Sequence, residues 1–168
     1  DSERNPKYLK DALPKLRKGE RSVSRKKRNS KNRQKSRKAV ATVYSRVANL
    51  RREHHHQVAL RLIHRYGLIA VERLNITNML KSGRFSRAIS DVAWGNFLLT
   101  LKCKAERAGV SIVEVNPSGT TQECSACGKV VPKDLSVRWH ECECGCSLDR
   151  DHNAAKNILQ RALLARTG

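Results

Sequence analysis

The stretch ECSACGKVVPKDLSVRWHECECGCSLDRDHNAAKNIL, residues 123–159, holds five of the six cysteines in this chain of 168 residues. Cys124 and Cys127 form one closely spaced pair and Cys142 and Cys144 another, and a glycine directly follows each pair. This spacing is typical of the two knuckles of a zinc ribbon, where glycine lets backbone N–H groups turn toward the thiolate sulfurs. Four thiolates suit tetrahedral Zn²⁺, and the segment between them is too polar to fold without a metal. The sequence therefore predicts a structural zinc site at these four cysteines.

The second cysteine pair is irregular, because one residue separates its members where two are usual. Cys146 could therefore replace Cys142 or Cys144 as a ligand, and His140 is a further alternative. We favour the two pairs themselves, because a glycine follows the second cysteine of both.

The chain as a whole is strongly basic, with 35 Lys and Arg against 15 Asp and Glu and a formal net charge of +20. Such a charge repels itself unless an acidic polymer offsets it, and nucleic acid is the first candidate. Basic residues are densest over residues 15–38, where Glu20 is the single acid. We expect a basic arm over residues 1–36 that is partly disordered when free and contacts phosphates without stacking on bases. The residues predicted to bind nucleic acid are Arg25, Lys26, Lys27, Arg28, Lys31, Arg33, Lys35, Arg37 and Lys38.

Several classes of protein are excluded by the pattern. No segment approaches the roughly 18 consecutive apolar residues that a membrane-spanning helix needs, and the N-terminus lacks the apolar core of a secretory signal. The cysteine spacing argues against a secreted disulfide-rich protein. We expect no membrane partner and a cytoplasmic, nucleoid-associated location in a bacterial or archaeal cell.

Hydrophobic periodicity predicts alternating helices and strands. Apolar residues recur at steps of three and four from about residue 37, which predicts a long helix that ends near Arg65. The apolar run Leu68–Glu72 indicates a buried strand that ends in a carboxylate. A second helix is expected over residues 90–108, followed by a second strand at Ser111–Val115.

A last helix is predicted to begin near Asp151, which itself or through a neighbour caps the helix. Its expected buried face consists of Ala155, Ile158, Leu159, Ala162 and Leu163. An Asp at this position can be a helix cap and nothing more. It can also meet Glu72, because carboxylates at the ends of strands and helices hold Mg²⁺ for phosphodiester cleavage. Spacing alone leaves both interpretations open.

Four ordered motifs resemble the C-terminal part of the TnpB family. TnpB proteins are OrfB-type proteins of bacterial insertion sequences, often described as transposases and related to type V CRISPR effectors. The resemblance covers nearly the whole chain, including NPKYL (5–9) and the basic segment that follows. The four motifs are VERLN (71–75), SDVAWGNF (90–97), NPSGTTQECSACG (116–128) and LDRDHNAAKNIL (148–159).

The resemblance implies an α/β fold, a partial RNase H-like (RuvC) domain with a zinc-ribbon insertion and a long basic N-terminal helix or arm. In the family, a guide RNA pairs with target DNA and the RuvC site cuts DNA with Mg²⁺. Glu72 matches the family's central catalytic Glu, Asp151 matches its last catalytic Asp, and Asp149 matches a supporting acid. The implied division is a basic arm at 1–36, a partial RuvC-like domain at 37–119, a zinc ribbon at 120–147 and a C-terminal RuvC helix at 148–168.

One departure from the family pattern concerns the first catalytic Asp. In the family this residue lies on a strand upstream of the region that resembles NPKYL, and this chain starts just before that region. We therefore expect a fragment that is inactive alone and that an upstream polypeptide would complete.

The expected function is the C-terminal RuvC and zinc-ribbon part of a transposon-encoded, RNA-guided DNA endonuclease. Its expected partners are DNA and guide RNA, and its expected cofactors are structural Zn²⁺ and catalytic Mg²⁺. The alternative is a catalytically inactive regulator that binds nucleic acid, or a truncated relic.

Overall fold

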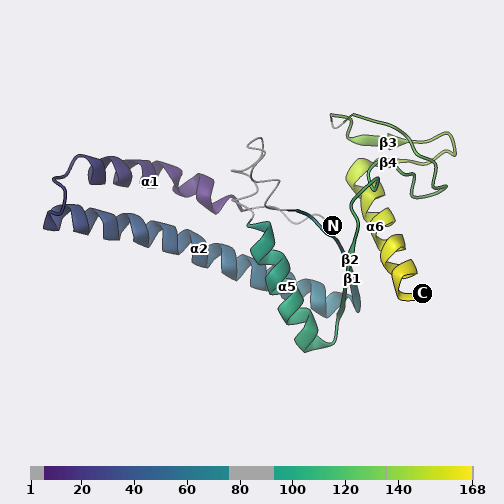
Figure 1. The fold of residues 1–168 in the computed structure, drawn as a ribbon, viewed down its shortest axis with the longest axis horizontal. Coiled ribbons are helices and arrows are strands. Elements are labelled where there is room, and N and C mark those ends of the chain that lie inside the picture. The colour runs from purple at the N-terminus through teal and green to yellow at the C-terminus, as the bar shows by residue number, and fades with distance from the viewer. Residues whose placement is uncertain (1–5, 76–92, 135, 168) are drawn as a thin grey trace. The chain divides into compact units, whose positions relative to one another are not determined.

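The computed structural model describes residues 6–75, 93–134 and 136–167 (Figure 1). The chain divides into two compact units, Asp1–Leu62 with Asn75–Lys104 and Ile63–Leu74 with Ala105–Gly168. Each unit is described by itself below. Within the described parts of the chain, no helix is long and apolar enough to cross a membrane.

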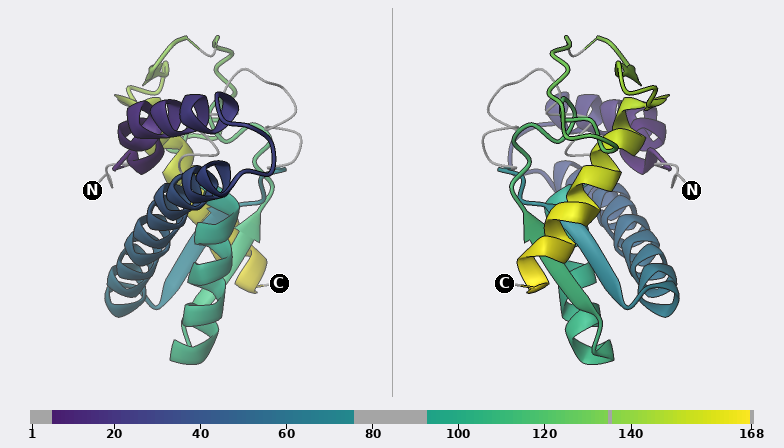
Figure 2. Two further views of the ribbon diagram at one scale, coloured as in Figure 1. Left: turned by 90° about the vertical axis from the view of Figure 1, so that its left-hand side faces the viewer. Right: turned by 90° about the vertical axis from the view of Figure 1, so that its right-hand side faces the viewer.

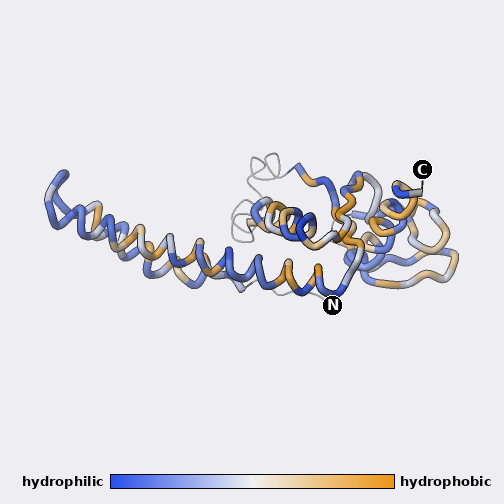
Figure 3. The backbone as a smooth tube through the Cα atoms, turned by 90° about the horizontal axis from the view of Figure 1, so that it is seen from below, coloured by the Kyte–Doolittle hydropathy of each residue, from blue (hydrophilic) through white to orange (hydrophobic). Residues whose placement is uncertain are grey.

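The first unit contains a hairpin of two long helices, α1 (Tyr8–Ser24) and α2 (Lys31–Arg65), which lie side by side in Figures 1 and 2. The Tyr44 hydroxyl on α2 donates a hydrogen bond of 2.8 Å to Glu20 Oε1 on α1. Figure 3 shows that polar residues predominate along the hairpin, with short apolar stretches between them. Few apolar residues are therefore available for packing between the two helices.

Helix α2 ends at Arg65 as predicted, but it begins at Lys31, six residues earlier than the apolar periodicity indicated. Residues 8–24, expected to lie in the basic arm, form helix α1. The physical reason is tertiary: Leu16 on α1 is 2% exposed, and burial in the folded unit is not revealed by periodicity within one segment. Partial disorder of the free arm in solution remains a prediction.

Helix α5 (Trp94–Ala108) follows, and its end at Ala108 is the one predicted for the second helix. Ala93, expected within that helix, instead lies in a turn before it with φ +49°, which is incompatible with a right-handed helix. The part expected over residues 90–92 lies outside the described residues. Within the first unit, the Phe97 ring of α5 packs edge-on against the His55 ring of α2, with centroids 5.6 Å apart. His55, Leu98 and Leu101 are buried.

The second unit is built on two parallel strands, β1 (Leu68–Glu72) and β2 (Ser111–Val115), whose bounds are those predicted. Leu68 lies opposite Ser111, and Glu72 opposite Val115. Helix α6 (Arg150–Thr167) packs on this sheet and runs antiparallel to both strands (Figure 2). Its first turn therefore lies toward the end of the sheet where both strands finish.

The cysteine-rich segment, residues 116–149, connects β2 to α6 along the chain. It contains the antiparallel hairpin of β3 (Trp139–Glu141) and β4 (Ser147–Asp149), and an isolated bridge between Glu123 and Val130. These short elements bury few apolar side chains. The fold of this segment accordingly depends on what its cysteines hold.

The predicted buried face of α6 is only partly right. Ala162 is fully buried and Ile158 is half-buried, but Ala155, Leu159 and Leu163 are exposed. The interior positions are occupied in their place by the amides of Asn153 and Asn157, together with Ala154. Hydrophobic periodicity missed these asparagines because their burial depends on hydrogen bonds to the cysteine-rich segment.

The N-terminus of α6 is capped by Asp149, a neighbour of Asp151 as the sequence allowed. Its Oδ1 accepts hydrogen bonds from the backbone N–H groups of Asp151 at 2.8 Å and His152 at 3.2 Å. Asp151 lies inside the first turn, and its side chain is 81% exposed. The two acids therefore have different structural roles.

Replacing the cap should destabilise the protein more than replacing its neighbour. We expect Asp149→Ala to lower the free energy of unfolding by about 1 kcal/mol, because two backbone donors lose their acceptor. The control Asp151→Ala should cost about 0.5 kcal/mol or less, since it removes only a favourable charge near the helix dipole. Urea unfolding of the metal-loaded chain measures both, and equal losses would contradict the assignment of the cap.

Candidate metal centre and carboxylate site

Both cysteine pairs meet at one point of the second unit. Cys124 Sγ lies 3.7 Å from Cys144 Sγ, and Cys127 Sγ lies 3.6 Å from Cys142 Sγ. All four sulfurs lie within 4.8 Å of one another. A tetrahedron of thiolates around Zn²⁺, with Zn–S bonds near 2.3 Å, has edges of about 3.8 Å. The cluster therefore has the size and donor set to hold a metal such as zinc.

The alternative ligands named from the sequence lie beside the same cluster. The structure places Cys124, His140 and Cys146 in a second group whose ligand atoms lie within 4.8 Å of one another. His140 is fully buried, and its Nδ1 contacts Lys133 Nζ. Among the described residues, its Nε2 has no hydrogen-bond partner. Both ligand sets share Cys124, so the four-cysteine set stays a prediction.

The irregular second knuckle still turns at its glycine. Gly128 and Gly145 have φ values of +76° and +86°, in the left-handed region that favours glycine. The N–H of Gly128 donates to Cys124 O at 2.8 Å, and the N–H of Gly145 donates to Cys142 O at 2.9 Å. Both knuckles thus close at a glycine with positive φ, but the hydrogen bond spans four residues in the first turn and three in the second.

Electrostatics differ sharply between the thiols. Burial raises the pKa of Cys124, but hydrogen bonds from the backbone N–H groups of Ala126 and Cys127 outweigh it and lower the pKa to about 5. For Cys144, the backbone N–H of Cys146 lowers the pKa, but the neighbouring thiols have the larger combined effect and raise the pKa to about 12. A divalent cation would remove this mutual repulsion, because it allows all four sulfurs to be thiolates.

Glu72 and Asp151, the carboxylates that match the family's catalytic acids, lie in β1 and α6. Glu72 ends its strand, and its Oε1 accepts a hydrogen bond of 2.9 Å from Thr120 Oγ1. Asp151 Oδ1 lies 3.4 Å from Arg150 Nε. In the described chain, the groups of three or more ligand side chains contain neither carboxylate. The described side chains by themselves therefore do not make a Mg²⁺ site.

The nine basic residues predicted to bind nucleic acid lie in the first unit, in the turn between α1 and α2 and at the start of α2. Seven of them are exposed, while Lys26 and Arg33 are half-buried. Lys26 Nζ contacts the Ser36 hydroxyl. Most of these cations are therefore accessible to a phosphate backbone.

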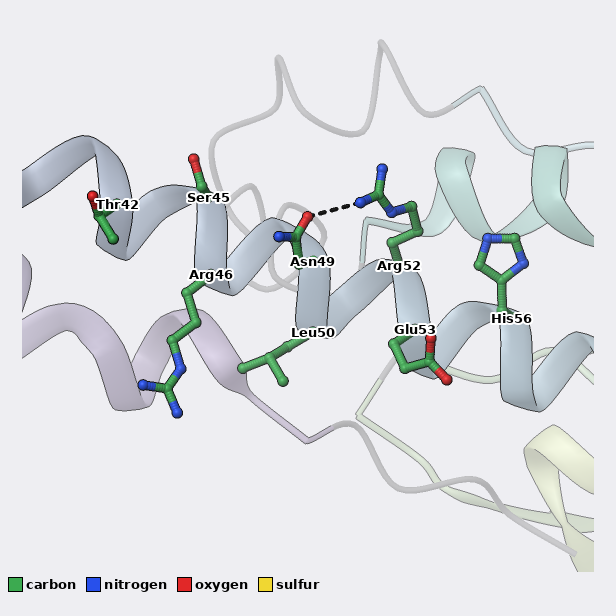
Figure 4. A pocket seen from close by; sticks show the side chains of 8 residues that line it. All are labelled: Thr42, Ser45, Arg46, Asn49, Leu50, Arg52, Glu53 and His56. Carbon is green, nitrogen blue, oxygen red and sulfur yellow. Dashed lines mark hydrogen bonds between the residues drawn. The ribbon is translucent and has the colours of Figure 1, made fainter. Parts of the chain in front are cut away.

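Farther along α2, a shallow groove of about 540 Å³ lies over one face of the helix (Figure 4). Hydroxyl, amide, guanidinium and imidazole groups line it, and Glu53 is the acid among them. Arg52 Nη2 donates a hydrogen bond of 2.8 Å to Asn49 Oδ1. The lining residues are Thr42, Ser45, Arg46, Asn49, Leu50, Arg52, Glu53 and His56.

Comparison with known proteins places this geometry in a family. The model of the family described as "Probable transposase" matches residues 3–83, and that of the "Cas12f1-like, TNB domain" matches residues 94–158. The "Putative RNA-guided DNA endonuclease" of Streptomyces pristinaespiralis is 39% identical over 165 residues, which are 96% of this chain and 40% of that protein. TnpB-like protein L79 of Acanthamoeba polyphaga mimivirus is 33% identical over 143 residues, 80% of this chain and 27% of that protein.

The chain belongs to the TnpB family. The resemblance inferred from four sequence motifs is thereby confirmed. The chain spans less than half the length of each of these two relatives.

A solved structure shares the fold of this TnpB-family chain. It is the cryo-EM structure of a complex of Cas12f1 with sgRNA and target DNA, which matches with a TM-score of 0.60 at 18% identity. The match covers 89% of this chain and 41% of that one. The mixed helix-and-strand architecture predicted for the chain is therefore shared with Cas12f1.

Three polar residues near the site were not singled out from the sequence. Thr120 contacts Glu72, while Asn153 and Asn157 bind the backbone of the cysteine-rich segment. The two asparagines are four positions apart on a predicted helix, so they share one face. This spacing, within the TnpB-family motif LDRDHNAAKNIL and beside its alanines, was the sequence signal that could have indicated two buried asparagines on one face of the helix.

Substitution of single cysteines should separate the two ligand sets. We expect Cys142→Ser to lower the zinc content of the purified chain well below one ion, because a thiolate ligand is removed. Cys146→Ser should retain one ion, and so should the control Cys103→Ser, whose cysteine is exposed on α5. Native mass spectrometry counts the bound metal. Retention of zinc by Cys142→Ser with loss in Cys146→Ser would show that the alternative set is used.

Proposed function

We propose that this chain forms the C-terminal nuclease and zinc-ribbon part of an RNA-guided DNA endonuclease of transposon origin. The observation that carries the proposal is the placement of Glu72 at the end of a parallel strand whose neighbour helix, α6, carries Asp151 in its first turn. Carboxylates at such strand and helix ends are suited to phosphodiester chemistry. The proposed fold is the corresponding part of an RNase H-like (RuvC) domain, which agrees with the likeness to Cas12f1.

Two different roles are proposed for metals. Zn²⁺ at the cysteine cluster would be structural, because four protein ligands leave no position for water. Mg²⁺ is the ion proposed for cleavage, since it prefers carboxylate oxygens, and Glu72 and Asp151 would act as its ligands. A working site would need oxygen ligands beyond these two.

RNA and DNA are the proposed partners. The Cas12f1 relative of known structure is in complex with sgRNA and target DNA. The net charge of +20 and the exposed cations at the α1–α2 turn support the same partners for this chain. The groove on α2 extends this surface with donors that suit phosphate oxygens. Sequence readout would belong to the guide RNA, because backbone contacts carry no sequence information.

The carboxylate roles can be tested in the nuclease that carries this chain. Glu72→Gln and Asp151→Asn should each abolish guided cleavage while guide and target binding persist, because each removes a metal-binding charge but keeps the shape. Glu106→Gln is the control: this acid is exposed on α5, so cleavage should be retained. Gel-based cleavage at saturating Mg²⁺ measures all three. Full cleavage by Glu72→Gln would show that the site is assigned wrongly.

The alternative function is nucleic-acid binding without cleavage. It is favoured by one observation: Glu72 and Asp151 belong to none of the metal-ligand groups formed by the described residues. Under this alternative, both carboxylate variants would leave every measurable activity of the chain unchanged.

Phosphate binding by the α1–α2 turn predicts a steep salt dependence. Replacing Lys27, Arg28 and Lys31 by Ala should reduce the slope of log affinity against log salt by up to about 0.9 for each phosphate that is no longer neutralised. Arg107→Ala, an exposed position on α5, should leave the slope unchanged. Binding of this chain to a duplex of mixed sequence at several salt concentrations measures the slope. A flat response in the unmodified chain would disprove phosphate binding.

A further inference from the structure

Thr120 makes a direct contact with the proposed catalytic carboxylate. It is 2% exposed and its Oγ1 donates a hydrogen bond of 2.9 Å to Glu72 Oε1, across 48 positions of the chain. A glutamate side chain samples several rotamers unless a contact fixes its carboxylate, whereas the β-branched threonine has few rotamers. A hydrogen bond to a charged acceptor is about twice as strong as one between neutral groups. Thr120 can therefore fix the orientation of Glu72.

The same hydroxyl has a second acceptor within reach, Pro117 O at 3.0 Å. A threonine hydroxyl has one proton, so the two acceptors compete for it. Pro117 O already accepts the backbone N–H of Thr120 at 3.3 Å, and a carboxylate oxygen is in general a stronger acceptor than a peptide carbonyl. The hydroxyl proton is thus directed to Glu72.

The backbone of Thr120 is itself held on both sides. Asn157 Nδ2 on α6 donates a hydrogen bond of 2.9 Å to Thr120 O. The preceding Gly119 has φ +76°, a backbone conformation that favours glycine and strains most other residues. Its carbonyl accepts the N–H groups of Gln122 and Glu123, both at 2.9 Å. The turn therefore presents the hydroxyl from a fixed position.

The contacts that hold Thr120 also hold the first cysteine knuckle. Asn153, fully buried, accepts the N–H of Ser125 at 2.9 Å and donates to Glu123 O at 2.7 Å. Asn157 donates to the same carbonyl at 2.7 Å. Ser125 directly follows Cys124. One helix face thus fixes the knuckle and the turn that reaches Glu72.

From these contacts we infer that Thr120 is a positioning residue for cleavage, which holds the Glu72 carboxylate through its hydroxyl while α6 and the cysteine-rich segment hold Thr120. This inference rests on the proposed role of Glu72 in the nuclease. Thr120 touches no reacting atom in this scheme and acts only through Glu72.

The test compares Thr120→Val, which keeps the shape but removes the hydroxyl, with Thr120→Ser, which keeps the hydroxyl. In the nuclease that carries this chain, Thr120→Val should lower kcat for guided cleavage about 10- to 100-fold, the range found when partners of metal ligands are removed. Affinity for guide and target should not change, and Thr120→Ser should keep most of the activity. The zinc content of each variant shows whether the cysteine cluster remains intact.

A second measurement needs no cleavage. In nuclear magnetic resonance spectra of the zinc-loaded chain, the Thr120 hydroxyl proton should show a through-space contact with the Glu72 side chain. The Glu72 carboxyl carbon signal should shift in Thr120→Val and stay nearly unchanged in Thr120→Ser. Absence of the contact in the unmodified chain would overturn the inference even if Thr120→Val failed to fold.

The outcomes separate this inference from the proposed function. If Glu72→Gln abolishes cleavage but Thr120→Val cleaves normally, the positioning role is overturned and the proposed function stands. Equal losses in Thr120→Val and Thr120→Ser would also overturn it, because they indicate a packing role. If Glu72→Gln cleaves normally, the proposed function fails, whatever Thr120→Val does.

Discussion

Hydrogen bonds from two buried amides on α6 connect the parts of the second unit. Asn153 and Asn157 bind backbone groups of residues 120–125, a segment with few apolar contacts of its own. A buried amide without a hydrogen-bond partner lowers the stability of the folded protein by about 1–3 kcal/mol. The two asparagines are therefore stable in the interior only while these backbone groups bind them. The position of the first cysteine knuckle against α6 therefore depends on these four bonds.

The two units meet different electrostatic demands. In the first, cations at the α1–α2 turn are exposed and the hairpin buries little, which suits a surface that binds a polyanion. In the second, five cysteines lie close together, and neighbouring groups lower the pKa of Cys124 and raise that of Cys144. The charge of the first unit thus favours binding of an anionic partner, and the thiols of the second favour binding of a metal. Both agree with the proposed nuclease of the TnpB family.

Sequence patterns predicted elements whose signals are local. Strands Leu68–Glu72 and Ser111–Val115 were found at their correct bounds, because short apolar runs follow glycine or a helix end. The cysteines were found through their spacing. The bounds of helix α1 within the expected basic helix or arm were not predicted, because the burial of Leu16 is a property of the folded unit. Thr120 was not predicted because its importance arises from a residue 48 positions away. Catalytic roles for Glu72 and Asp151 remain predictions, since the described geometry does not unite them.

The asparagine pair also limits how this chain can be shortened. Deleting the cysteine-rich segment to make a smaller protein would remove the carbonyl and N–H partners of Asn153 and Asn157 and leave two amides facing an empty surface. Replacing those amides by Ala or Leu would have to accompany the deletion. The cysteine-rich segment is therefore a structural part of the second unit. A shortened protein without it would also need new residues at the positions of Asn153 and Asn157 on α6.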